Sequence, residues 1–577
     1  MGQRDPKTLL QRYLPFLIVL LVQALLVAVL PSRGQAEDAL AGLTTDFTPG
    51  TPTNGLTGGS TDTTVAAGGT DPATGAPVTG GTGGGAAGGG GITTIPGGVG
   101  GGNGGGAGGG GGGGVPAGDM SHCTPDGRQQ GVTSFSAPCV PRFGGDNGGA
   151  TYAGVDGDTV RMVLVRNTFG PVVDGALSAG GLAASPEEEE STMNDFSEFF
   201  NKHYESYGRT VEWSYYLAEC DMSTDVVCAR TQARKIKERF DPFMVVTSLT
   251  VLPAYHDELS KLGVVNVGGW HQAAAFHKRL APFHYDWMPD GSRIAVSVGD
   301  YWCKKMAGDN AEHAGDVRLQ TTKRKLAVVG VDSQEGQEVV KEAIAYIQNT
   351  CPTTPIENYK YSGGFDKAGE EFGAMVADMV QKNVTTVLCM CDPIRPIFLT
   401  QAATTAVFFP EHFVSGMGAA DHDYFGRLYT QEQWTNAFGP GIQPANTEAS
   451  KQDDAKAYAD VGAEYRCFAC LANFLWMHLA HIQLQVAGPN LNPLTIEQGT
   501  LSLPPIGGFE QTGNPLVVLV RFGPGEYTAI ADSMETFWDP QATSKIDGRA
   551  GAYVCVQPDC RRYEIGKRPA GKAKVPH

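Results

Sequence analysis

The sequence predicts an α/β protein with two lobes, each built on a doubly wound, mostly parallel sheet. Short apolar segments rich in valine alternate with helical segments, as in parallel sheets whose strands are buried on both faces. This alternation continues up to an extended segment that ends at Pro289. A second alternation of strands and helices begins after it. A chain of 577 residues is also too long for one compact core, which favours two lobes.

Residues 1–36 carry basic side chains followed by an apolar run from Leu14 to Leu30. A helix of that length spans roughly 25 Å, against about 30 Å for the core of a bilayer. The run is also slightly longer than the apolar core of a secretory signal. Two interpretations stay open, an uncleaved anchor with one membrane span and a cleaved signal peptide. Both predict that the rest of the chain is exported.

Residues 37–121 are mostly Gly, Thr, Ala and Pro, a composition that cannot bury a core. We expect a disordered tether there. Residues 122–153 follow as a small segment bracketed by Cys123 and Cys139, which we expect to close a disulfide loop.

The elements of the first lobe follow from apolar runs and from helix start and stop signals. Acidic residues 187–190 suit the first turn of a helix, and Pro253 and Gly263 mark the start and end of another. The expected order is strand 160–166, helix 186–203, strand 211–217, helix 225–240, strand 243–248, helix 253–262 and strand 264–268.

The same alternation predicts the second lobe. We expect helix 292–306, strand 325–331, helix 334–349, strand 359–362, helix 367–382, strand 385–390, helix 393–405 and strand 412–415. One long helix over 454–486 and strands over 515–522 and 527–531 come next. The basic residues 567–577 predict a disordered tail.

Charge and cysteine content restrict the function. A net charge of −18 and a sequence pI near 5.1 argue against nucleic acid as a partner, because a nucleic-acid-binding protein presents a basic face. The even number of cysteines, 12, fits disulfides in an oxidising compartment better than cytosolic thiols.

A binding site is expected beyond the carboxyl ends of the parallel strands, where ligands of such sheets lie. In the first lobe these are the loops 247–251 and 268–272. In the second lobe, we expect polar residues that end strands to face the same cleft. The candidate ligand-binding residues are Ser248, Thr250, Gly269, Trp270, Asp332, Gln334 and Asp392. Each could instead cap a helix, as Asp392 before Pro393 would, and Trp270 could instead plug the cleft.

Other chemistry finds weaker support. Cys467 and Cys470 form a CxxC motif, for which a local disulfide or core thiols, a redox dithiol and a zinc site remain open. His271, His277 and His284 lie close in sequence, but their spacing fits no regular metal site. The chain contains no Gly-x-Ser-x-Gly, HExxH or phosphate-loop motif. We therefore expect no enzyme, no cofactor and no metal.

Four stretches resemble a known family. They are GVDGDTVRMVLV at 154–165, LAVVGVDSQEGQEVV at 326–340, SGGFDKAGEEF at 362–372 and FWDPQATSKIDGRAGAYVCVQPDCRRY at 537–563. In this order and spacing they resemble the type I periplasmic binding proteins, specifically the branched-chain amino acid/amide group of ABC-importer substrate-binding proteins, in an actinobacterial-like form. The resemblance covers residues 154–566.

The resemblance implies three crossings between the lobes, near 283–290, 439–444 and 511–515. Lobe 1 would then comprise residues 154–286 with 443–512, and lobe 2 residues 287–442 with 513–566. Sorted this way, each lobe receives an even number of cysteines. The firmest disulfides are Cys123–Cys139, Cys220–Cys228 and Cys555–Cys560. We expect no direct bond between Cys389 and Cys391, which lie on one strand.

The resemblance further implies a solute-binding protein that closes two lobes around a small polar ligand, an amino acid or amide, for an ABC importer and its permease. In that family the loops after strands three and four hold the α-carboxylate and α-amino groups of the ligand. Ser248, Thr250 and Gly269 match those loops in place. The alternative hypothesis is a membrane-tethered interaction or sensory head, in which the same fold carries a degenerate or plugged site.

Overall fold

The computed structural model describes residues 119–129, 134–170, 174, 177–178, 183–248, 251–365, 367–466 and 470–575. The predicted anchor or signal and nearly all of the predicted tether lie outside these residues, and so do Thr250 and Cys467. Among the described residues, no helix has the length and apolar character needed to cross a bilayer. Chain contacts separate residues 1–108 from a second compact unit, 109–577, which is the unit described below.

The first lobe contains a sheet of five strands, all parallel, in the order β2-β1-β3-β4-β5. Its strands are β1 (Thr159–Arg166), β2 (Thr210–Leu217), β3 (Met244–Thr247), β4 (Val265–Gly268) and β5 (His284–Tyr285). The helices between them are α4 (Pro186–His203), α5 (Val226–Phe240), α6 (Pro253–Lys261) and α7 (Ala274–Leu280). The predicted alternation of strand and helix is confirmed in this lobe.

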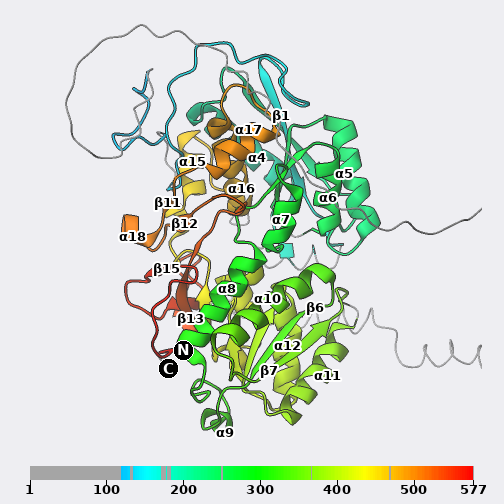
Figure 1. The fold of residues 1–577 in the computed structure, drawn as a ribbon, viewed down its shortest axis with the longest axis vertical. Coiled ribbons are helices and arrows are strands. Elements are labelled where there is room, and N and C mark those ends of the chain that lie inside the picture. Colours follow the sequence, from blue (N-terminus) through cyan, green and yellow to red (C-terminus); the bar gives the residue numbers. More distant parts are fainter. Residues whose placement is uncertain are drawn as a thin grey trace, which may run out of the picture. The chain divides into compact units, whose positions relative to one another are not determined.

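Both faces of this sheet are buried. Along β1, Met162 and Leu164 enter one hydrophobic cluster, whereas Val163 and Val165 enter another on the opposite face. Helices α5 and α6 cover the second face, and α4 and α16 (Cys470–Ala487) cover the first (Figure 1). This two-sided burial explains why the strands read as continuous apolar runs.

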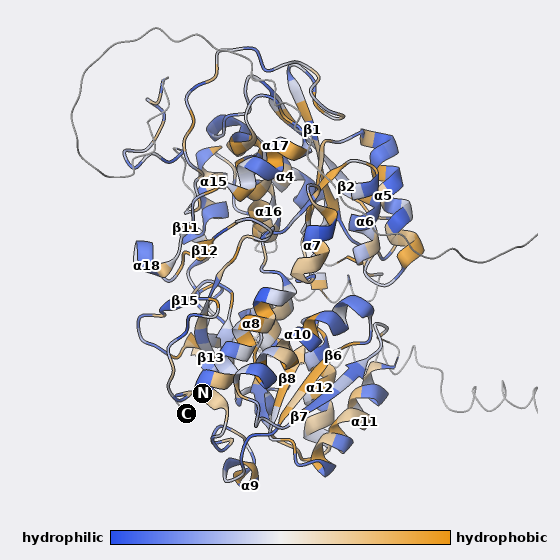
Figure 2. Ribbon diagram, viewed as in Figure 1, coloured by the Kyte–Doolittle hydropathy of each residue, from blue (hydrophilic) through white to orange (hydrophobic). Residues whose placement is uncertain are grey.

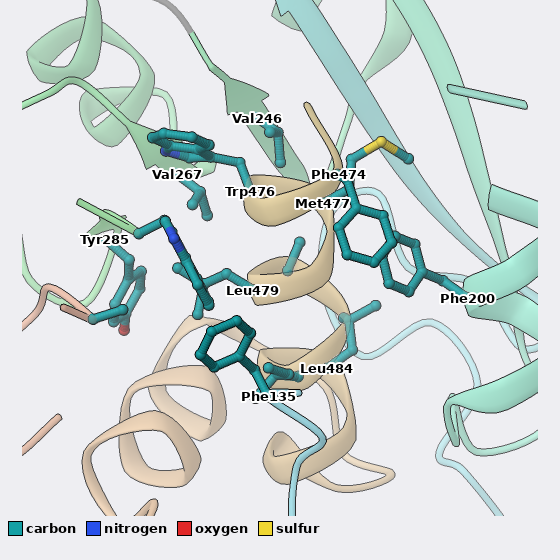
Figure 3. Packing of buried hydrophobic residues seen from close by; sticks show 14 of the residues in the cluster. Phe135, Phe200, Val246, Val267, Tyr285, Phe474, Trp476, Met477, Leu479 and Leu484 are labelled. Carbon is teal, nitrogen blue, oxygen red and sulfur yellow. The ribbon is translucent and has the colours of Figure 1, made fainter. Parts of the chain in front are cut away.

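Helix α16 lies in the centre of the larger cluster. Figure 3 shows Phe474 on the side of Phe200, and Trp476 beside Val246 and Val267 of the sheet. The prediction of one long helix over 454–486 was wrong, because the chain forms α15 (Asp453–Asp460) and then α16. Between them Gly462 has a φ of 73°, a conformation that ends a helix.

The rest of this lobe consists of short elements. They are the 3₁₀-helix η3 (Ala449–Lys451), α17 (Pro493–Leu501), β11 (Ile506–Gly507), α18 (Phe509–Thr512) and β12 (Leu519–Val520).

Within the described part of the chain, the second lobe holds an eight-stranded sheet in the order β14-β13-β10-β9-β8-β6-β7, with β15 paired to β13. Its strands are β6 (Leu326–Val331), β7 (Ile356–Tyr361), β8 (Thr386–Met390), β9 (Glu411–Phe413), β10 (Ala437–Gly441), β13 (Asp532–Thr543), β14 (Ala550–Cys555) and β15 (Arg562–Glu564). Strands β6 to β10 are parallel, and β13, β14 and β15 add an antiparallel edge.

Helices cover both faces of the parallel part of this sheet. Strands β6 and β8 are strongly hydrophobic in Figure 2, as expected for strands packed between two layers. The helical elements are α8 (Gly291–Tyr301), the π-helix η1 (Trp302–Met306), α9 (Val317–Gln320), α10 (Gln334–Thr350), α11 (Ala368–Gln381), α12 (Arg395–Thr405), the 3₁₀-helix η2 (Met417–Ala419), α13 (Asp423–Leu428) and α14 (Gln431–Trp434).

Three segments connect the lobes. The first and third run side by side, since the N–H of Ala529 donates to the carbonyl of Asp286 (2.9 Å) and that of Ile530 to the carbonyl of Trp287 (3.2 Å). The third connection was expected near 511–515. It lies later, because the first-lobe core extends to Ile530 and β13 begins only at Asp532.

The carboxyl-terminal residues 567–575 lie along the second lobe instead of forming the disordered tail that their composition predicts. The guanidinium of Arg568 is buried and donates to Glu535 (3.3 Å). The N–H of Ala573 donates to the carbonyl of Lys305 (3.0 Å). A buried ion pair and backbone pairing therefore hold a segment that sequence composition alone marks as a free end.

Five disulfides join described cysteines: Cys123–Cys139, Cys220–Cys228, Cys303–Cys351, Cys389–Cys391 and Cys555–Cys560. The prediction against a Cys389–Cys391 bond was wrong. Residues two apart in a strand share a face, and the chain bends where β8 ends at Met390. The two Cα atoms are therefore 5.1 Å apart, closer than the roughly 6.6 Å of extended chain.

Candidate ligand-binding site

Ser248 follows β3 at the carboxyl edge of the first-lobe sheet, where a ligand-binding residue was predicted. Its side chain is buried, and its hydroxyl donates to Oδ1 of Asn473 on α16. Thr250 lies outside the described residues. The hydroxyl that the sequence offers to a ligand is therefore already bonded within the lobe.

The loop after β4 has an unusual backbone. Four consecutive residues, 268–271, have φ angles of 128°, 115°, 51° and 63°. A Cβ at Gly268 would lie 2.0 Å from the carbonyl oxygen of Thr247, and one at Gly269 would lie 2.8 Å from Nε2 of His256. Both positions therefore require glycine, and the strain carried by the two non-glycine residues is typical of a functional loop.

Trp270 is half-buried at the tip of this loop. Its indole Nε1–H donates to the carbonyl oxygen of Ser248 (2.7 Å), and its backbone N–H donates to Oδ2 of Asp286 (2.8 Å). Its ring stacks on that of Trp476, with centroids 5.5 Å apart and an interplanar angle of 15°. The tryptophan thus ties together the loops after β3 and β4, which were predicted to bind the two ends of an amino acid.

Asp286 is a fully buried carboxylate at the start of the first connection between the lobes. Besides Trp270, it accepts hydrogen bonds on Oδ1 from Nε1 of Trp476 (2.8 Å) and from the N–H of Met288 (3.1 Å). None of these three donors is charged, and burial raises the pKa of Asp286 to about 7. The carboxylate fixes both tryptophans with respect to the connection.

Sequence reasoning missed Asp286, Asn473 and Trp476. Asp286 follows a strand of two residues, and the other two lie on a helix that is buried almost all round. No periodicity separates such residues from core positions, so only the fold brings them to the loops.

The histidines near this loop form a packed cluster. The rings of His256 and His277 lie 4.4 and 4.6 Å from that of His284, and burial lowers the pKa of His256 and of His277 to about 4. Nδ1–H of His271 donates to the carbonyl of Pro289 (2.7 Å). The imidazoles of His256 and His277 are thus neutral packing groups next to the loop.

Metal ligation was also considered for the cysteines. Among the described residues, the one group with the spacing of metal ligands is His122, Cys123 and Cys139, whose two sulfur atoms are bonded to each other. Cys470 of the CxxC motif is likewise disulfide-bonded.

The three candidates of the second lobe end strands or begin helices. Asp332 is exposed and pairs with Lys360 (2.9 Å), and Gln334 is the exposed first residue of α10. Asp392 accepts the N–H of Ile394 (3.0 Å) and that of Arg395 (3.3 Å). Asp392 therefore holds the turn that leads into α12, a role close to the helix cap noted for it above. No interaction between described residues joins these three to Ser248, Gly269 or Trp270.

No protein-family model matches the chain, and no curated protein matches it either. Solved structures, by contrast, are similar to the chain. A periplasmic binding protein from Burkholderia mallei is similar at 10% identity and a TM-score of 0.50, over 71% of this chain and 95% of its own.

Two further structures are similar over 70–71% of this chain and 97% of their own. They are an ABC transporter substrate-binding protein from Aeropyrum pernix, at 12% identity and a TM-score of 0.49, and a branched-chain amino acid ABC transporter protein from Thermus thermophilus with bound valine, at 11% and 0.49. Similarity at such identities establishes the fold alone. The chain has the type I periplasmic-binding-protein fold, as its resemblance to that family predicted.

Proposed function

We propose that this chain is an exported, non-enzymatic solute-binding protein that closes its two lobes around a small polar ligand, of amino acid or amide type, for an ABC importer. The observation that carries the proposal is the fold: two mostly parallel sheets joined by three connections, with the predicted loops at the carboxyl edges of the strands. The five disulfides support an extracytoplasmic location, because such bonds persist in oxidising compartments.

The proposed ligand contacts remain those of the predicted loops and strand ends. Because the Ser248 hydroxyl and both N–H groups of Trp270 are bonded within the protein, a ligand that uses them must exchange these bonds on binding. Binding would therefore be coupled to a rearrangement of the loop 268–271. Such coupling suits a protein whose lobes close around the ligand.

A thermal-shift screen of unit 109–577 tests this proposal. This unit contains the hydrophobic clusters and disulfides described above, so it carries its own core. Amino acids, amides, short peptides and aromatic acids form the panel. A ligand at about 100 times its Kd stabilises the folded state by about 2.7 kcal/mol, a readily visible shift. A well-folded sample that responds to no compound would contradict solute binding.

The geometry of Trp270 favours a second candidate, a tethered interaction head whose small-molecule site is plugged. The indole covers the carbonyl of Ser248 and stacks on Trp476. The variant Trp270→Ala distinguishes the two candidate functions. If Trp270 is part of the ligand site, the variant loses binding of the solute found in the screen, whereas removal of a plug creates binding that the parent lacks. Trp213→Ala, at a half-buried tryptophan of β2, is the matched control.

A further inference from the structure

A separate cavity lies where the connections between the lobes meet α15 and α16. Its volume is about 170 Å³, and its wall includes residues of all three connections, among them Met288, Ala445 and Ile530. None of the six described residues among those proposed above as ligand contacts lines it. A ligand in this cavity would therefore bind at a place separate from the loop site.

Apolar side chains form much of the cavity wall. Phe135 packs edge-on against Trp287, with ring centroids 5.1 Å apart at 80°, and Leu471 and Leu475 of α16 line the same space. An apolar cavity of roughly 150 Å³ is large enough to bind a benzene-sized molecule. The wall thus fits a hydrocarbon body of about six carbon atoms.

Charged groups line the cavity as well, among them two lysines and one aspartate. Asp453 is buried and is already satisfied by the backbone N–H of Ser134 (2.7 Å), the hydroxyl of Ser134 (3.2 Å) and Nζ of Lys456 (3.0 Å). Lys456 retains two further N–H donors. Lys451 also lines the cavity, and its ammonium pairs with the exposed carboxylate of Glu448 (3.0 Å). Each ammonium group is thus paired with one carboxylate and keeps further N–H donors that can meet an anionic ligand.

We propose that this cavity is a second ligand site, which binds a small monocarboxylate with an apolar body. The apolar body packs among Phe135, Trp287 and Leu475, and the carboxylate meets Lys451 and Lys456. Because residues of every connection between the lobes line the cavity, a bound acid contacts the segments about which the lobes move. This proposal stands independently of the loop site.

Calorimetry and thermal shift of unit 109–577 with hexanoate and with hexanol test the assignment. Hexanoate is expected to bind and to raise the melting temperature, and hexanol, which lacks the charge, to bind more weakly. Lys451→Gln is expected to weaken hexanoate binding about 1.5- to 5-fold, the range for an exposed ion pair, without changing hexanol binding. Lys235→Gln on α5 is the matched control, a lysine of 42% side-chain exposure away from the cavity.

Variants in which a larger side chain fills the cavity provide the second part of the experiment. Leu475→Trp, or Leu471→Trp should the first variant fail to fold, is expected to abolish hexanoate binding. Leu494→Trp, at a residue of α17 that is 59% exposed and does not line the cavity, is expected to leave it intact. Hexanoate binding that survives in a folded Leu475→Trp variant would overturn the site. Equal binding of hexanol and hexanoate would overturn its assignment to an anion, and no binding of either compound to the parent would overturn the proposal.

Discussion

Asp286 is a buried side chain that orients several groups of the candidate site through its hydrogen bonds. A carboxylate removed from water is costly unless it is paired with a cation or well hydrogen-bonded. Asp286 has three neutral donors and no basic partner among them, so burial dominates and its pKa rises to about 7. The two tryptophans of the candidate site are thus held by a group that titrates near neutral pH.

This titration makes a prediction about stability. Between about pH 4 and 7 the folded protein retains a proton on Asp286 that the unfolded chain releases, so the free energy of unfolding falls as pH rises through this window. Asp286→Asn removes that contribution, which amounts to as much as about 4 kcal/mol. Urea unfolding of parent and variant at pH 4.5 and 7.5 measures it.

Glu189 and Asp454, whose pKa values burial also raises to about 7, are common to both proteins and cancel in the comparison. The free-energy difference between parent and variant is therefore expected to change with pH. A difference that stays constant from pH 4.5 to 7.5 would show that Asp286 does not titrate in this range.

At the scale of the elements, local signals determine where most helices begin. Ser185 caps α4 in a capping box: its hydroxyl accepts the N–H of Glu188, whose carboxylate accepts the N–H of Ser185. Such signals depend on a few neighbouring residues, and for this reason the boundaries of α4 could be predicted from the sequence.

Ser185→Ala is expected to lower the free energy of unfolding by about 1 kcal/mol, because the N–H of Glu188 in the first turn of α4 loses its acceptor. Chemical denaturation measures the change. Ser191→Ala, within the same helix, is the control and should be neutral or slightly stabilising, since alanine favours helix interiors. An equal loss in both variants would argue against the cap.

Elements and loops that depend on tertiary contacts could not be predicted as well. The break between α15 and α16 rests on one glycine in a sequence whose apolar pattern continues through it. The loops after β3 and β4 were located from the order of strands and helices. Their partners Asn473 and Trp476 were not, because they lie more than 200 residues further along the chain. The order of strands and helices thus located these two loops without showing that their polar groups are already bonded.

For the whole molecule, the disulfides stabilise the fold according to the length of chain that they close. Cys303–Cys351 closes a separation of 48 residues, whereas Cys389–Cys391 closes one of 2. A cross-link stabilises chiefly by restricting the unfolded chain, and more so for longer loops. The two bonds should therefore differ widely in their effect on stability.

Replacing both cysteines of a pair by serine tests this difference. Loss of Cys303–Cys351 is expected to lower the free energy of unfolding by about 4 kcal/mol, and loss of Cys389–Cys391 by about 1 kcal/mol. Guanidinium unfolding of the two double variants gives the values. A larger loss from the short pair would mean that it acts through the native state, at the end of β8, and not through the unfolded chain.

The pairing of the first and third connections has a mechanical consequence. Hydrogen bonds from Ala529 and Ile530 to Asp286 and Trp287 make these two segments a short parallel ribbon. A force that pulls the lobes apart stretches this ribbon and loads its hydrogen bonds in shear. We therefore expect the ribbon to twist more readily than it stretches. The second connection is clamped separately, by the guanidinium of Arg562 on the carbonyls of Ile442 and Gln443. The lobes are thereby joined at two places, the paired connections and the clamped second connection. We expect them to rotate mainly about the line through these two places.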